Sequence, residues 1–141
     1  MFRTKYNTDG SISKYKARLI AKGFHQTVGI DYSETFSPVV KSSTVRVVLS
    51  IVVMQGWKVR QIDVNNAFLN GDLIEDVYMI QPEGFSLKDG YVCKLNKGLY
   101  GLKQALRAWY EKLKSCLVRW GFNNSRADTS LFIKSKRKLV S

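Results

Sequence analysis

An acidic side chain interrupts an apolar stretch of the sequence VRQIDVNNAFLNG, where Asp63 stands between Ile62 and Val64. A carboxylate in such a place keeps contact with solvent, pairs with a cation or binds a metal ion, because an unpaired buried charge is costly. The two asparagines that follow also allow Asp63 to be a residue that caps the turn after a strand. These alternatives stay open, since one carboxylate alone does not define a metal site.

Cationic side chains recur in a second stretch, YKARLIAKGF, which alternates in the manner of a half-buried strand. Lys16, Arg18 and Lys22 fall on the same face of that strand. Both residue types bind phosphate groups, and arginine does so through a bidentate fork. The alternative is a strand face that is merely solvated.

The hydrophobic pattern predicts the elements that position these residues. A buried helix is expected up to Met54, with Ser43 or Thr44 as its N-cap and Gly56 at its end. The segment KVRQIDV alternates, which predicts a central strand carrying Asp63 near its carboxyl end.

The remaining pattern predicts a turn through NNAFLNGDL and strands at DVYMIQP, GYVCKL and TSLFIKS. The clearest helix is GLKQALRAWYEKLKSCLVRWGF, where apolar residues recur every three or four positions and Gly121 forms the cap. Trp109 and Trp120 are expected in the core. Strands and helices do not alternate strictly, so we expect an α+β fold with a mixed or antiparallel sheet packed on helices.

Composition limits the class of protein. The 141 residues suit one domain or a piece of one, and no apolar run reaches the roughly 18–20 residues of a membrane span, so no membrane partner is expected. Lys and Arg outnumber Asp and Glu by 23 to 11, giving a net charge of +12. A polyanion is therefore the expected partner, nucleic acid before a membrane surface. Cys93 and Cys116 show no metal-ligand spacing and are expected to be free thiols.

The stretch QIDVNNAFLNG resembles the first carboxylate motif of reverse transcriptases. Its neighbours YKARLIAKGFHQTVGIDYSETFSPVV, NGDLIEDVYMIQPEGF and VCKLNKGLYGLKQALRAWYEKL are similar, in order and spacing, to blocks of the copia-type LTR retrotransposon enzymes. The resemblance runs from about Lys14 to Ile133. It implies an RNA-directed DNA polymerase region of a Pol polyprotein with a partial right-hand fold. Residues 1–42 and 71–98 would belong to the fingers, and 43–70 and 99–141 to an incomplete palm.

The resemblance also implies roles for single residues. Asp63 and the backbone carbonyl of Val64 would bind divalent cations, usually Mg²⁺, which activate a 3′-hydroxyl and neutralise charge on the leaving pyrophosphate. Phe68 stands where related enzymes carry an aromatic residue that excludes ribonucleotides by crowding the sugar 2′ position; the alternative is a core aromatic. Lys16 and Arg18 would hold the triphosphate of the incoming deoxynucleotide.

The stretch YGLKQALRAW resembles the family block that packs beneath the nascent base pair and the template strand. Gly101 would let the backbone approach the nucleotide closely, and Gln104 would contact it. Leu106 stands where the family usually has proline, so the kink that sets the approach of this loop is expected to differ.

The family's second carboxylate block, Tyr-x-Asp-Asp, does not occur in this sequence, nor do the thumb, connection and RNase H segments. Asp72, Glu75, Asp76 and Asp128 lack the context of that block and are expected to be surface or turn acids. We therefore expect a reverse transcriptase fragment with negligible polymerase activity by itself. Its partners would be a deoxynucleoside triphosphate and an RNA or DNA template-primer.

Two alternatives accompany this interpretation. The chain could be a basic nucleic-acid-binding module without chemistry, which uses its charge to hold phosphates. It could also be a marginally folded product of a decayed element, because the strand of Asp63 would lack its neighbours. The sequence indicates neither an oligomeric state nor a compartment; by resemblance, the candidates are a cytoplasmic particle and the nucleus.

Overall fold

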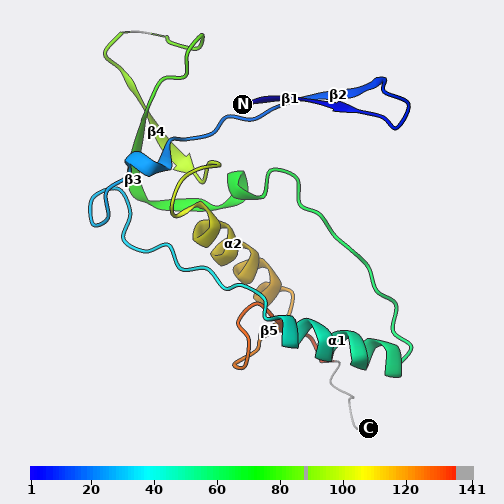
Figure 1. The fold of residues 1–141 in the computed structure, drawn as a ribbon. Helices are drawn as coiled ribbons and strands as arrows, with labels where there is room; N and C mark the ends of the chain where they lie inside the picture. Colours follow the sequence, from blue (N-terminus) through cyan, green and yellow to red (C-terminus); the bar gives the residue numbers. More distant parts are fainter. Residues whose placement is uncertain (88, 136–141) are drawn as a thin grey trace.

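The computed structural model describes residues 1–87 and 89–135, and within them it contains three separate two-stranded antiparallel sheets and two α-helices (Figure 1). Strands β1 (Phe2–Tyr6) and β2 (Ile12–Ala17) form the first sheet, β3 (Asp72–Ile80) and β4 (Val92–Lys97) the second, and β5 (Asn123–Asn124) and β6 (Phe132–Ile133) the third. The predicted α+β class is confirmed, with short antiparallel sheets in place of one continuous sheet.

Helix α1 (Ser42–Met54) lies where the sequence predicts it, but its N-cap is Lys41 and not Ser43 or Thr44. The amide of Lys41 and the hydroxyl of Thr44 both donate to the carboxylate of Asp128, at 3.2 and 2.6 Å. A carboxylate far along the chain therefore accepts from the backbone amide of the N-cap residue and from the hydroxyl of Thr44 in the first turn, and no side chain caps the helix locally.

Helix α2 (Ala105–Arg119) begins four positions after Gly101, later than the periodicity predicts. Gly101 has a φ of +91°, which a right-handed helix does not accommodate. At the other end, Trp120 is the C-cap and Gly121 has a φ of +85°, as expected for a glycine that ends a helix. Two short 3₁₀ helices, η1 (Gly23–His25) and η2 (Ala67–Asn70), complete the elements of the described residues.

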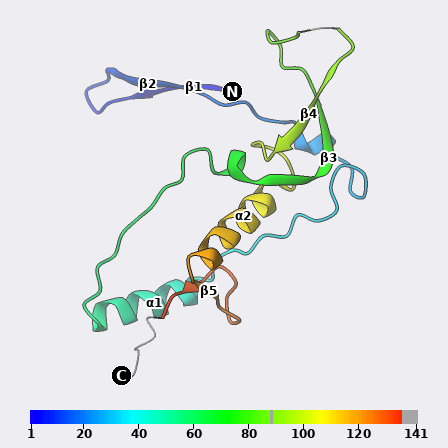
Figure 2. The ribbon, with the colours of Figure 1, turned by 180° about the vertical axis from the view of Figure 1, so that it is seen from behind.

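The strand predicted at residues 58–64 is not formed. In both ribbon views this segment runs as a single extended trace from α1 to η2, and its residues are exposed (Figures 1 and 2). A strand is stabilised by hydrogen bonds to a neighbouring strand, and no strand of the described residues pairs with this segment. Asp63 therefore lies on an unpaired connection and not at the end of a central strand.

The strand predicted across YKARLIAKGF is shorter than expected. β2 pairs with β1, and the ladder ends where Ala17 lies opposite Phe2, so only Lys16 of the three cations lies in the strand. Arg18 and Lys22 follow it, although Ile20 forms an isolated parallel bridge with Tyr100.

The hydrophobic core is small and lies between β3, β4 and the start of α2. Its buried residues are Ala21, Val77, Leu99, Leu102 and Ala105, against which Phe68, Leu73, Met79 and Leu95 pack. Helix α1 has no buried residue and Trp120 is 65% exposed, so the predictions that both are buried are wrong, whereas Trp109 is half-buried. A groove along α1 is lined by Trp57 and by the β5–β6 region.

The chain exposes far more surface than a compact protein of its size. Its accessible area is 12083 Å², whereas a compact monomer of 16.1 kDa has about 7400 Å². Much of the excess is apolar, because the exposed residues include most of α1 and the 57–64 connection. Neither α-helix in the described residues is long and apolar enough to cross a membrane.

Candidate functional site

Side chains from three segments meet around the ring of Tyr100. The guanidinium carbon of Arg18 lies 5.5 Å from the centroid of that ring, which places the cation over it. The Tyr100 ring in turn packs edge to face on Phe68, with centroids 4.7 Å apart and planes at 76°. All three side chains are half-buried. Two residues predicted to bind nucleotide, Arg18 and Phe68, are thus joined through a residue that the sequence analysis did not single out.

Close backbone packing fixes the segment of Tyr100. The amide of Ala21 donates to the carbonyl of Tyr100 at 2.7 Å. A Cβ atom on Gly101 would lie 2.1 Å from the carbonyl oxygen of Ala21, and one on Gly23 would lie 1.8 Å from the carbonyl oxygen of Gly101. The closest approach made by Gly101 is therefore to the chain's own backbone; its approach to a nucleotide stays a prediction.

A second close approach holds Phe68 in place. The amide of Gly98 donates to the carbonyl of Gly71 at 2.8 Å, and a Cβ atom on Gly98 would meet the carbonyl oxygen of Phe68 at 2.7 Å. The density of glycines in KGLYGLK is the only sequence signal of these contacts, because glycine is needed where two backbones approach this closely.

Gln104 is only 2% exposed, and its amide is engaged within the protein. Its Nε2 donates to the carbonyl of Asp31 at 3.0 Å, and its Oε1 accepts from Nε2 of Gln26, also at 3.0 Å. The Oε1 of Gln26 accepts from the backbone amide of Lys103 at 2.8 Å. Gln104 therefore ties the loop of Gln26 and Asp31 to the start of α2, and its predicted contact with a nucleotide is not part of this arrangement.

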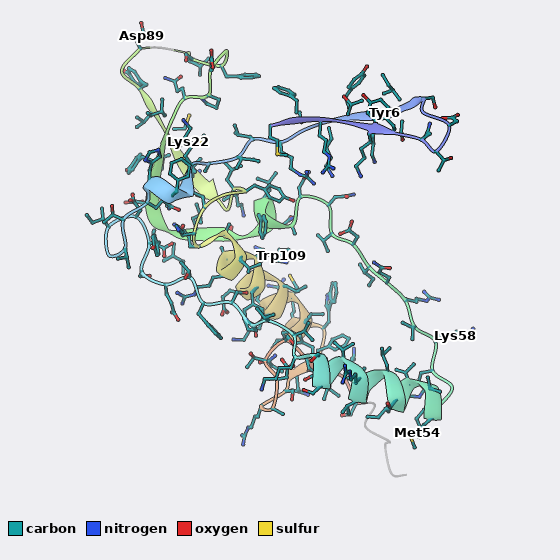
Figure 3. All side chains as sticks on the ribbon, in the orientation of Figure 1. Tyr6, Lys22, Met54, Lys58, Asp89 and Trp109 are labelled. Carbon is teal, nitrogen blue, oxygen red and sulfur yellow. The ribbon has the colours of Figure 1, made fainter. Side chains whose placement is uncertain are left out.

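The β1–β2 hairpin concentrates positive charge on one face. Figure 3 shows the hairpin, which carries Tyr6, extending away from the rest of the chain. The register of the hairpin places Arg3 opposite Lys16 and Lys5 opposite Lys14, so two like-charged pairs face each other directly. Such pairs destabilise an isolated hairpin. The positive charge of Arg18, followed by partial burial and by the charges of Lys5 and Lys14, lowers the pKa of Lys16. This face is therefore suited to an anion that relieves the repulsion.

Asp63 and Val64 lie exposed beside this cationic region, and the charge of Asp63 acts on Lys16 against the effect of its cationic neighbours. The described residues contain no group of three or more His, Cys, Asp or Glu that could hold a metal ion. Mg²⁺ requires near-octahedral coordination by oxygen. One carboxylate and one carbonyl do not meet this requirement, so the residues present do not form a complete magnesium site.

The other acids serve the fold. Asp128 is a turn acid, as predicted, but it is only 5% exposed. Hydrogen bonds from Ser130 and Thr44 hold its pKa well below the ordinary value. Asp72 is exposed and forms ion pairs with Lys97 and Lys112, the latter at 2.8 Å, and hydrogen bonds from these lysines, Lys112 first, lower its pKa to about 2. Asp76 pairs with Lys94 at 2.6 Å.

We expect the chain to lose stability in acid because of Asp128 and Asp72. Their pKa values are lowered from 3.8 in the folded state, so their contribution is present above about pH 4 and is lost as the pH falls below it. Urea unfolding between pH 5 and pH 2.5 measures this loss. The variant Asp128→Asn should show a weaker pH dependence, while replacing the exposed Asp89 by Asn should leave it unchanged. An unaltered dependence in Asp128→Asn would contradict the assignment.

A cleft with a volume of about 700 Å³ lies between residues 19–31 and residues 77–83, with Leu95 and Leu102 also lining it. Of the cations on the predicted strand face, Lys22 lines this cleft, whereas Lys16 and Arg18 do not, nor do the other predicted site residues Asp63, Val64, Phe68, Gly101 and Gln104. We therefore place the candidate site on the open surface around Arg18, Tyr100 and Phe68, where the predicted residues converge.

Comparison with known proteins agrees with the resemblance noted in the sequence. Residues 1–140 match the family described as reverse transcriptase (RNA-dependent DNA polymerase). The chain is 58% identical over 142 residues to the "Retrovirus-related Pol polyprotein from transposon RE1" of Arabidopsis thaliana, covering 99% of this chain and 10% of that protein. It is 47% identical over 136 residues to the corresponding polyprotein from transposon TNT 1-94 of Nicotiana tabacum, covering 95% of this chain and 10% of that protein. No solved structure matches the chain.

Proposed function

The chain belongs to the reverse transcriptase family and corresponds to part of the reverse transcriptase region of a retrotransposon Pol polyprotein, and on this premise we propose that it forms the nucleotide-binding side of an RNA-directed DNA polymerase site. It spans about a tenth of the length of these relatives, at 10% of each. The substrates would be a deoxynucleoside triphosphate and an RNA or DNA template-primer. Residues 1–42 and 71–98 would be fingers, and 43–70 and 99–141 palm.

The convergence of Arg18, Tyr100 and Phe68 is the observation that carries this proposal. A guanidinium presents donors to the oxygens of a triphosphate, and an aromatic ring close to it can limit the space beside the sugar. Lys16 adds a second cation on the adjoining strand, and Asp63 brings a carboxylate within electrostatic range of Lys16. Cations for phosphate, a ring for the sugar and an acid are thus contributed by segments far apart in the sequence.

The requirement for magnesium limits the DNA synthesis that the isolated chain can perform. The family implies divalent cations, but the described residues supply only Asp63 and the carbonyl of Val64 toward them. The other oxygen ligands would come from further parts of a polymerase. We therefore expect negligible DNA synthesis by the 141-residue chain alone.

The two alternatives are not favoured, because the family match extends over residues 1–140 and not over the basic hairpin alone. The cationic face of the hairpin fits the same polymerase function, in which phosphate groups of the substrate or template are bound.

A chimera tests the proposal. This chain would replace the matched 142 residues of the RE1 polyprotein, and DNA synthesis would be measured on an RNA template with all four deoxynucleotides. We expect the chimera to synthesise DNA and the isolated chain to synthesise none. A folded chimera that binds template-primer but incorporates no nucleotide would contradict the proposed function.

We also expect the hairpin to contribute phosphate contacts. Replacing Arg3 and Lys5 by glutamine removes two cations, so the slope of log affinity against log salt for single-stranded RNA should become shallower by about 1.4. Fluorescence anisotropy with a labelled RNA measures the slope. Arg46→Gln, on the exposed part of α1, is the control and should change it little. Equal slopes for the hairpin variant and the unaltered chain would show that the hairpin does not bind phosphates.

A further inference from the structure

We propose that Tyr100 is a positioning residue. It orients Arg18 toward the triphosphate of the incoming nucleotide and holds the Arg18 side chain at a fixed position relative to Phe68. This inference rests on the proposed function and names a residue through which two parts of that site act together. It comes from the contacts of Tyr100, the first residue of the block YGLKQALRAW, to which the sequence motifs gave no separate role.

The main chain of Tyr100 is anchored to the segment that carries Arg18. Its carbonyl accepts from the amide of Ala21 at 2.7 Å, and its backbone forms a parallel bridge with Ile20. The bridge therefore lies only two residues beyond Arg18, so displacement of Tyr100 would move the Arg18 segment with it.

The side chain of Tyr100 makes contact with both predicted nucleotide-binding side chains. Arg18 lies over its ring at 5.5 Å, and Phe68 meets the ring edge to face at 4.7 Å. Aromatic pairs of this geometry have a preferred orientation, which distinguishes them from apolar contacts without direction. One ring therefore sets the positions of a cation and of the proposed sugar-side aromatic.

The contact orients Arg18 without neutralising its charge. No carboxylate of the described residues forms an ion pair with Arg18, in contrast to Arg107, whose guanidinium binds Glu34 at 2.8 Å. A π face attracts a cation but does not occupy its N–H donors as a carboxylate would. Arg18 therefore keeps its side-chain N–H donors available for phosphate, whereas one donor of Arg107 is engaged by Glu34.

The charges nearby make such positioning necessary. Lys16 and Arg18 repel each other at the end of β2, and strand β1, which pairs with β2, adds the positive charges of Arg3 and Lys5. Without the ring, repulsion would direct the guanidinium away from Lys16 and into solvent, since the Arg18 side chain is only half-buried.

The test measures kinetics of RNA-templated synthesis by the RE1 chimera. Tyr100→Leu keeps an apolar side chain but removes the π face, so we expect the KM for deoxynucleotide to rise about 3- to 10-fold with kcat little changed. Tyr100→Phe, which keeps the ring, should restore the KM. In an Arg18→Ala background, Tyr100→Leu should have no further effect on the KM, because the group that it positions is absent.

A second ring provides the control for loss of packing. Tyr110 also lies beneath a cation, Lys114 at 5.8 Å, but on α2 and away from the site. Tyr110→Leu should lower stability without raising the KM. A KM unchanged in Tyr100→Leu, or raised equally in the Arg18→Ala background, would overturn the inference while leaving the proposed function intact. No synthesis by the unaltered, folded chimera would overturn the proposed function and this inference with it.

Discussion

Replacing Asp63 by asparagine in the RE1 chimera should reduce RNA-templated DNA synthesis by more than about 100-fold, because loss of a direct cation ligand exceeds the 10- to 100-fold effect of outer partners. The side chain is exposed and its segment is unpaired, so the substitution removes a charge and leaves packing unchanged. The loss should therefore appear in kcat, while the affinity for template-primer stays close to that of the unaltered chimera.

Asp76→Asn is the matched control for this result. Asp76 is also an exposed acid, and its only ion pair in the described residues is the surface contact with Lys94 at 2.6 Å. Surface pairs contribute little to stability, so this variant should keep its activity. Synthesis by Asp63→Asn at the level of the control would show that Asp63 has no role as a ligand and is only an exposed acid of the connection.

Gly101→Ala should lower the free energy of unfolding by about 3 kcal/mol or more, since it combines a disfavoured backbone angle with overpacking. The added Cβ atom would lie 2.1 Å from the carbonyl oxygen of Ala21, at a φ of +91°. Relief would require the segments of Ala21 and Tyr100 to separate, which breaks the contact on which the candidate site depends. Urea unfolding followed by tryptophan fluorescence measures the change.

Two other glycines distinguish the cost of the disfavoured backbone angle from the cost of the steric clash. Gly29 has a φ of +81° but nothing within 4 Å of its added Cβ, so Gly29→Ala should cost only about 1 kcal/mol of backbone strain. Gly23 has no positive φ, yet its Cβ would lie 1.8 Å from the carbonyl oxygen of Gly101, so Gly23→Ala reports the clash alone. If all three variants lost equal stability, the close packing of the Gly23 and Gly101 segments would not be the cause.

Local patterns in the sequence predicted the local elements well. The ends of α1 and α2 lie within a few residues of the predicted limits, and β3 and β4 overlap their predicted strands. Helix hydrogen bonds connect residues close in sequence, and β3 and β4 form an antiparallel pair over a short connection. The local periodicity of the sequence is therefore sufficient to predict most of these helices and strands.

The predictions that were wrong depend on contacts between segments far apart in the sequence. The alternation of residues 58–64 satisfies the pattern of a strand, but a strand also needs a neighbour, and none of the described residues supplies one. In the same way, α1 has the composition of a buried helix and no buried residue. Burial depends on what lies against the helix, which its own sequence does not specify.

The same distinction between local pattern and distant contact applies to the candidate site. The sequence by itself determined the family. The roles proposed for Arg18 toward phosphate, for Phe68 beside the sugar and for Asp63 toward a cation follow from that family. Only the tertiary structure decided that Tyr100 joins Arg18 to Phe68 and that Gln104 is held inside the protein. These contacts arise where glycines let distant backbones approach each other, and such approaches depend on the whole chain path and not on any local pattern.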